Sequence, residues 1–129
     1  MRINITPTVK ARPRFNTTTG RTHTPHTTKD FEEELAWKYK QAGGKFYEGN
    51  LKVKLVFAFI PPRSWSKKKQ REALEGKIRP SKMDTDNLIK SVTDSLNGIA
   101  YTDDRYIYKV EAEKKYDIEE YIEIEIKGE

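Results

Sequence analysis

The chain has 129 residues and a mass of 15.1 kDa, which is enough for one ordinary domain and too little for a second core of similar size. Charged residues make up 35% of it and hydrophobic residues another 35%, so we expect a small core beneath a strongly ionic surface. It contains no cysteine, which excludes disulfides, thiolate zinc sites and cysteine nucleophiles. No apolar run is long enough to cross a bilayer and the N-terminus lacks a signal-peptide pattern, which predicts a soluble, cytoplasmic protein.

The formal net charge of +5 is unevenly distributed along the chain. Residues 1–29 carry six Lys/Arg and no acid, and residues 61–83 carry eight bases against two acids. Residues 84–129 reverse this balance, with six bases against thirteen acids. One basic run is often only a solvated surface, but two separate runs favour a polyanionic partner, and nucleic acid in particular.

The first quarter of the chain predicts a short strand and a long loop. Residues 2–6 alternate polar and apolar, and residues 7–25 are rich in Pro, Thr, Gly and Arg. Arg12, Arg14 and Arg21 lie in this loop near Phe15, a mixture that suits phosphate contact and base stacking. A surface loop without such a role is the alternative.

A helix and a strand follow. Phe31, Leu35 and Tyr39 recur every four residues within a predicted helix over 28–41, with Trp37 expected beside this buried stripe. Residues 51–60 alternate and then become apolar throughout, which predicts a strand buried on both faces at its far end.

The second basic segment predicts a short helix and a basic connector. Ser66 is the expected N-cap of the helix, and residues 77–82 form the connector. We expect the bases of this segment to contact the DNA backbone; they are Lys67, Lys68, Lys69, Arg71, Arg79 and Lys82.

The remaining elements predict an α+β fold in a single domain, with a mixed β-sheet and helices packed on one face. A helix is expected over 87–97, ending before Gly98. Strands are expected over 106–116 and 121–126, joined as a hairpin by residues 117–120. In the first of these strands Tyr106, Tyr108, Val110 and Ala112 share the apolar face.

Several acids follow the basic connector and predict a cation site. Asp84 and Asp86, at i and i+2 before a helix, project to one side, and Lys90 lies one helical turn beyond Asp86. A chain reversal at Gly98 is expected to return Asp103 and Asp104 toward the start of the same helix. Clustered carboxylates suit Mg²⁺ or Mn²⁺, and an ammonium beside them would stabilise charge on a phosphodiester.

Each of these residues also has an ordinary structural explanation. Asp86 is a good N-cap, Lys90 can pair with Asp94 at i+4, and two consecutive aspartates can form a turn. A calcium-binding loop beginning at Asp84 is disfavoured, because its sixth and twelfth positions are Ile89 and Ser95 instead of Gly and Glu.

The residues that carry these acids resemble a known family. The stretch Asp84-Thr85-Asp86-Asn87-Leu88-Ile89-Lys90, then Asp94, Leu96-Asn97-Gly98 and Asp103-Asp104, is similar to the RusA family of Holliday junction resolvases. The basic lead-in over 61–69 and the early stretch over 10–15 resemble prophage members of that family.

The resemblance implies a homodimeric, Mg²⁺- or Mn²⁺-dependent endodeoxyribonuclease of bacterial or phage origin that introduces paired nicks into four-way DNA junctions during recombination and repair. It implies no organic cofactor and no membrane partner. By position, Asp84, Asp86 and Asp104 would bind the metal, Lys90 would be the essential lysine and Asp103 would be accessory.

Two other functions remain open from the residues themselves. One is a non-catalytic DNA- or RNA-binding module in which the acids are structural. The other is a nuclease with the same chemistry that acts on other branched or flapped DNA.

Overall fold

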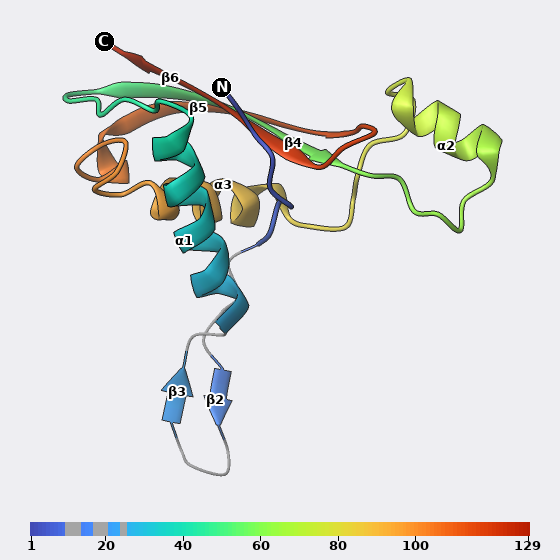
Figure 1. The fold of residues 1–129 in the computed structure, drawn as a ribbon, viewed down its shortest axis with the longest axis horizontal. Helices are drawn as coiled ribbons and strands as arrows, with labels where there is room; N and C mark the ends of the chain where they lie inside the picture. Colours follow the sequence, from blue (N-terminus) through green and yellow to red (C-terminus); the bar gives the residue numbers. More distant parts are fainter. Residues whose placement is uncertain (10–13, 17–20, 24–25) are drawn as a thin grey trace.

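The computed structural model describes residues 1–9, 14–16, 21–23 and 26–129. Its main sheet has four strands in the order β1-β6-β4-β5 (Figure 1). The central strand β4 (Leu51–Phe59) is parallel to β5 (Ile107–Tyr116) and antiparallel to β6 (Tyr121–Gly128), and β6 is antiparallel to β1 (Arg2–Ile3). The sheet is therefore mixed, and the α+β fold predicted from the sequence is confirmed.

The predicted hairpin of the last two strands is wrong. β5 and β6 follow one another in the chain, but β4 lies between them and pairs with both. The connection between them passes the end of β4, where the Asp117 N–H donates to the Phe59 carbonyl over 2.8 Å. β4 takes the central position because its apolar end, including Phe57, Ala58 and Phe59, is buried and needs cover on both sides.

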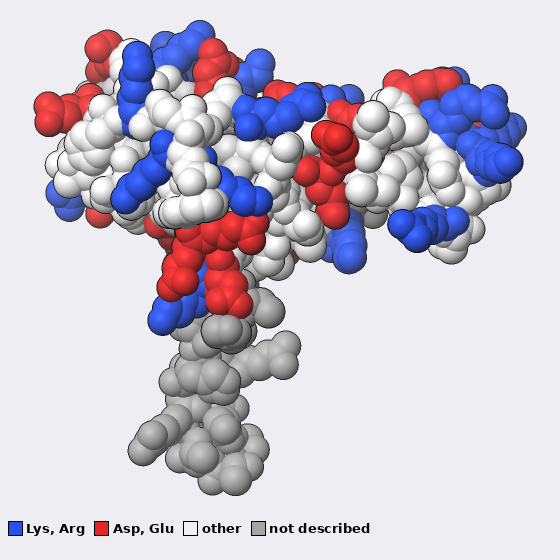
Figure 2. Space-filling model, viewed as in Figure 1, with Lys and Arg blue, Asp and Glu red and all other residues white. Residues whose placement is uncertain are grey.

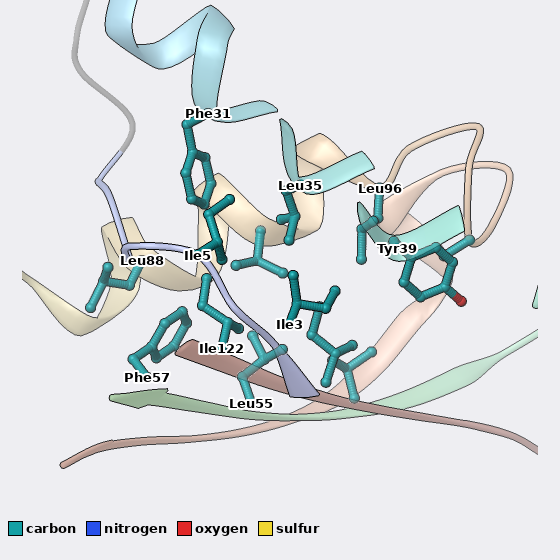
Figure 3. Close-up of a cluster of buried hydrophobic side chains, with 14 of the residues drawn as sticks. Ile3, Ile5, Phe31, Leu35, Tyr39, Leu55, Phe57, Leu88, Leu96 and Ile122 are labelled. Atoms are coloured by element: carbon teal, nitrogen blue, oxygen red, sulfur yellow. The ribbon is translucent and has the colours of Figure 1, made fainter. Parts of the chain in front are cut away.

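Helices α1 (His26–Gln41) and α3 (Thr85–Ser95) cover one face of the sheet (Figure 1). Figure 3 shows the core that they enclose, in which side chains of both helices meet those of β4, β6 and the N-terminal segment. The predicted stripe on α1 is confirmed, since Phe31, Leu35 and Tyr39 are all buried, whereas Trp37 is 59% exposed and lies outside the core.

The opposite face of the sheet is open to solvent and strongly charged. The strand register places Lys54 of β4 between Glu111 of β5 and Glu125 of β6. Lys109 and Lys127 form ion pairs with glutamates on their own strands, over 3.6 Å and 3.4 Å. This polar face matches the alternation of the sequence.

The apolar face predicted for the strand over 106–116 is largely exposed. Tyr106 belongs to the 3₁₀ turn η1 (Asp104–Tyr106), and a register shift in the β4–β5 pairing leaves Tyr108 opposite no residue of β4. Tyr106, Tyr108 and Val110 are 37%, 53% and 39% exposed. β5 is an edge strand with one neighbour, so the sheet and helices do not cover the side chains at the start of this strand.

The segment predicted as one long loop contains a small hairpin in the part that the structure describes. β2 (Arg14–Asn16) pairs antiparallel with β3 (Arg21–His23), aligning Phe15 with Thr22. Phe and Thr favour extended backbone. The Pro and Gly content of the segment led instead to the prediction of a loop. The first strand is shorter than predicted because only Arg2 and Ile3 pair with β6.

Candidate active site

Helix α3 carries the predicted acidic and basic residues along one side. Its apolar stripe, Leu88, Val92 and Leu96, is buried in the core. Asp86, Lys90 and Asp94 recur every four residues, about half a turn of the helix away from that stripe. Asp86 and Lys90 are exposed and Asp94 is half-buried, so the line of charges faces outward from the core.

The helix begins two residues earlier than predicted. Asp84, with extended backbone angles, is the N-cap residue in place of Asp86, and the Leu88 N–H donates to its carbonyl over 3.1 Å. The Asp84 side chain accepts no hydrogen bond from the backbone of the first turn and stays exposed. The preceding residue is held by β5, because Lys114 Nζ donates to the Met83 carbonyl over 2.7 Å. Asp84 and Asp86 thus lie at the anchored start of α3.

A tight loop follows α3 and folds back on the helix. Gly98 has a φ of +76°, which favours glycine, and its N–H donates to the Tyr101 carbonyl over 2.7 Å. Tyr101 is 2% exposed, and its hydroxyl donates to the Thr93 carbonyl over 2.6 Å. Burial, together with the nearby carboxylates of Asp104 and Asp94, raises the pKa of Tyr101. The phenol therefore stays protonated as a structural anchor.

The acidic pair lies immediately beyond this anchor. The Asp103 carboxylate caps η1 by accepting from the Arg105 N–H over 2.9 Å. The Asp104 N–H donates to Asn97 Oδ1 over 2.8 Å, and the Asp104 carboxyl group lies close to Asp94. Burial raises the pKa of Asp104, and the contacts with Asp94 and then Asp103 raise it further. The two aspartates thus differ: one caps a turn and the other faces a third acid.

The acidic pair returns to α3, but at the opposite end from the one predicted. Asp104 contacts Asp94 in the last turn, whereas Asp86 lies eight residues earlier, about 12 Å along the helix axis. Among the residues that the structure describes, no three His, Cys, Asp or Glu side chains form a group arranged to hold a metal ion. The sequence around Gly98 predicts that the chain reverses, but not which end of α3 the returning loop contacts, because that contact depends on how the loop packs.

The donor set at this end of α3 nevertheless suits a hard cation in its chemistry. Asp94, Asp103 and Asp104 supply carboxylate oxygens, which Mg²⁺ and Mn²⁺ prefer. The last turn of α3 contains no basic residue, and a helix C-terminus carries partial negative charge. The neighbouring carboxylates of Asp94 and Asp103 add to the effect of burial on the pKa of Asp104. Asp94 belongs to the acidic motif quoted from the sequence, which gave it no metal-binding role.

Comparison with known proteins identifies the family. The model of the family described as "Endodeoxyribonuclease RusA" matches residues 4–127. The chain belongs to the RusA family of endodeoxyribonucleases. The resemblance found in the acidic motif is thereby confirmed over almost the whole chain. A relative from Bacillus subtilis (strain 168), "Uncharacterized protein YqaN", is 32% identical over 127 residues, which cover 94% of this chain and 89% of the relative.

Membership of the RusA family supports nuclease activity. The basic residues predicted to contact DNA lie partly on a short helix. α2 (Lys67–Leu74) begins after the predicted cap, with Ser66 Oγ accepting from the Lys69 N–H over 3.2 Å. It projects beyond the end of β4 (Figure 1), and Figure 2 shows its exposed lysines and arginine as the blue group on the right. This group comprises Lys67, Lys68, Lys69 and Arg71.

An aromatic contact fixes α2 to the sheet. The Trp65 ring meets the Tyr116 ring of β5 edge-on, with centroids 5.5 Å apart. Gln70 Nε2 donates to the Trp65 carbonyl over 2.9 Å, and Lys69 Nζ lies 4.1 Å from the centre of the Trp65 ring. α2 therefore presents its bases from a defined position rather than on a free loop.

The other predicted DNA contacts in this RusA-family chain fall in different settings. Arg79 is exposed but has partners on β5, since Nη1 donates to the Lys114 carbonyl over 3.2 Å and lies 3.9 Å from Glu113. Lys82 is exposed. Arg14 and Arg21 begin the two strands of the hairpin, and Arg12 lies outside the described residues.

No helix in the described parts of the chain has the length and apolar character needed to span a membrane.

Proposed function

We propose that this protein is a metal-dependent endodeoxyribonuclease that resolves four-way DNA junctions by paired phosphodiester hydrolysis, in recombination and repair. The observation that carries the proposal is the line of Asp86, Lys90 and Asp94 along α3, which ends at Asp103 and Asp104, in a chain of an endodeoxyribonuclease family. An ammonium flanked by carboxylates on an exposed face suits phosphodiester hydrolysis.

Asp84 and Asp86 at the start of α3, and Asp104 at its end, are the residues proposed to hold Mg²⁺ or Mn²⁺, with Asp103 accessory. When bound, the ion supplies Lewis-acid stabilisation of the phosphate and lowers the pKa of the attacking water. The two groups of acids lie about two helical turns apart along α3. The stoichiometry of Mn²⁺ binding distinguishes one shared ion from separate ions at the two ends.

Lys90 is positioned to contact the substrate rather than to stabilise the folded chain. Its side chain is exposed between Asp86 and Asp94, so its ammonium can reach a phosphate placed along α3. There it would stabilise the charge that develops on the phosphodiester. The bases of α2, the residue 77–82 connector and the β2–β3 hairpin would hold the DNA backbone at a distance from the cut.

We further propose that two copies act together. A four-way junction has approximate two-fold symmetry, and paired nicks at symmetric positions require two active sites related by the same symmetry. A homodimer provides that arrangement with a single gene product.

The deciding experiment compares wild type with Asp86→Asn on a synthetic four-way junction and on a linear duplex of the same sequence, with Mg²⁺ and with chelator. Glu125→Gln, which removes one negative charge from the opposite face of the sheet, is the matched control. We expect paired, Mg²⁺-dependent nicks in the junction alone, for wild type and Glu125→Gln but not for Asp86→Asn.

Asp86→Asn should still bind the junction, because removing a carboxylate lessens repulsion of phosphate. Binding by wild type without cleavage under every metal condition would instead indicate a non-catalytic binding module. Cleavage of flapped or forked DNA in preference to the junction would support the proposed hydrolysis but contradict the four-way junction as the substrate.

A further inference from the structure

The first half of β5 is an open edge of the sheet that carries apolar side chains. Among the strands that the structure describes, β5 has β4 as its one neighbour, so its other edge faces away from the sheet. Tyr108 and Val110 are 53% and 39% exposed there, and Ala112 is half-buried two residues further along. The free edge of a strand is a template for pairing with a strand of another chain.

The second half of β5 contacts the segment that precedes α3. Arg79 Nη1 donates to the Lys114 carbonyl over 3.2 Å, and the Trp65 ring meets the Tyr116 ring edge-on. These contacts lie at residues 114–116, beyond the stretch 107–112 that contains the exposed apolar side chains. The open stretch is about as long as an ordinary strand, so a partner strand has room to pair with it.

The charges of this stretch are complementary to themselves when two copies pair antiparallel. Facing side chains lie on the same side of such a sheet, so in a two-fold symmetric pair one residue faces its own copy. With Val110 at that position, Lys109 faces the partner's Glu111, and Glu111 faces the partner's Lys109. With Lys109 or Glu111 at that position instead, two like charges face each other. Opposite charges at facing positions stabilise a strand pair and like charges destabilise it, so the charges select the register centred on Val110.

Both sides of the sheet fit this register. On the open face, Lys109 and Glu111 form an ion pair over 3.6 Å, so pairing would place four charges of alternating sign around the two-fold axis. On the side of the helices, Val110 lies next to the buried Val53 of β4 and would contact the partner's Val110. Pairing would therefore extend the apolar layer of one copy into that of the other.

We propose that the open half of β5 is the dimer interface of this protein, where two copies pair antiparallel about Val110 and join their sheets into one. The inference rests on the two-copy arrangement of the proposed function. It names the surface that would supply the two-fold symmetry required for paired nicks. The occupant is a second copy because the stretch is complementary to its own sequence.

Charge reversal tests the register. Lys109→Glu and Glu111→Lys each place like charges at both facing positions, whereas the double variant restores opposite charges. Lys127→Glu is the matched control, because Lys127 forms the same kind of ion pair on β6, with Glu125 over 3.4 Å. Sedimentation velocity over a range of protein concentrations gives the dimer dissociation constant of each variant.

We expect each single reversal to raise the dimer dissociation constant by about 10-fold or more, because two facing pairs become repulsive. The double variant should return the constant toward wild type, and Lys127→Glu should leave it unchanged. Recovery in the double variant separates repulsion at the interface from a general loss of folding.

A single cysteine tests the same register without a change in charge. The chain contains no cysteine, and facing residues in an antiparallel pair have Cα atoms about 4.5–5.5 Å apart, within the range that a disulfide spans. Val110→Cys should therefore form a covalent dimer when oxidised by glutathione disulfide. Ile118→Cys, at a residue that is 74% exposed in the turn between β5 and β6, should stay monomeric on a denaturing gel under the same conditions.

Three results would overturn the inference in a protein whose wild type is dimeric. They are wild-type dissociation constants in both single reversals, a double variant as weak as the singles, and the absence of a covalent dimer in Val110→Cys. A wild type that is monomeric at every concentration and on the junction would overturn the two-copy part of the proposed function, and the inference with it. A dimer that follows the charge-reversal pattern without cleaving the junction would support the interface and contradict the proposed nuclease.

Discussion

The carboxyl group of Asp104 lies beside that of Asp94, which brings together two acids ten positions apart in the chain. Both lie at the C-terminal end of α3, where no base is present in the last turn. The pKa of Asp104 is raised, first by burial and then by Asp94 and Asp103.

This raised pKa predicts a pH-dependent stability. An acid whose pKa is higher in the folded chain stabilises the fold below its unfolded pKa, and this contribution is lost as the pH rises through the folded pKa. Asp104→Asn should therefore raise the melting temperature at pH 7 in chelator, by about 1–3 °C, and flatten its decline between about pH 4 and pH 7. Thermal unfolding across this range tests it, with Glu125→Gln as control. A lower melting temperature for Asp104→Asn at pH 7 would contradict the prediction.

Tyr101→Phe tests the anchor of the acidic loop. The variant keeps the buried ring and removes the hydroxyl that donates to the Thr93 carbonyl over 2.6 Å. We expect the free energy of unfolding to fall by about 1 kcal/mol, measured by urea denaturation, because one buried hydrogen bond is lost. Tyr47→Phe, which alters a half-buried tyrosine beside the same loop, provides the comparison. An equal fall in the free energy of unfolding in the two variants would show that the hydrogen bond to Thr93 stabilises the loop no more than the Tyr47 hydroxyl does.

Lys114→Met tests the attachment of α3 to the sheet. The ammonium donates to the Met83 carbonyl over 2.7 Å, directly before Asp84, so its removal should cost about 1 kcal/mol of stability. It should also slow junction cleavage several-fold by loosening the start of α3. Lys127→Met, on the open face of the sheet, is the control for the loss of one positive charge. Cleavage at the wild-type rate in Lys114→Met would show that the contact between Lys114 and Met83 does not affect the active site.

Lys68→Ala tests whether α2 contacts the DNA backbone. Lys68 is exposed on a helix that Trp65 and Tyr116 hold in place, so a single phosphate contact should disappear without a change in fold. Junction binding should weaken, and the slope of log affinity against log salt should fall by about one. Lys127→Ala, on the open face of the sheet, should leave the slope unchanged. An unaltered slope in Lys68→Ala would remove that residue from the interface.

Local sequence rules predicted most of the helices and strands, and the position of some of the candidate site residues. The four-residue spacing of Phe31, Leu35 and Tyr39 predicted the buried side of α1, and Ser66 marked the start of α2. The same spacing placed Asp86 and Lys90 on one side of α3. These features depend on residues a few positions apart, so hydrophobic periodicity and capping chemistry are sufficient to predict them.

Only the tertiary structure decided the strand order and the partner of Asp104. β4 separates β5 from β6 because the sheet places its most buried strand in the middle, and no pattern within 106–126 contains that information. Asp104 meets Asp94 instead of Asp84 and Asp86 because the buried Tyr101 fixes the returning loop at the C-terminal end of α3. Contacts between distant parts of a chain are set by which packing buries the most apolar surface, and that is a property of the whole fold.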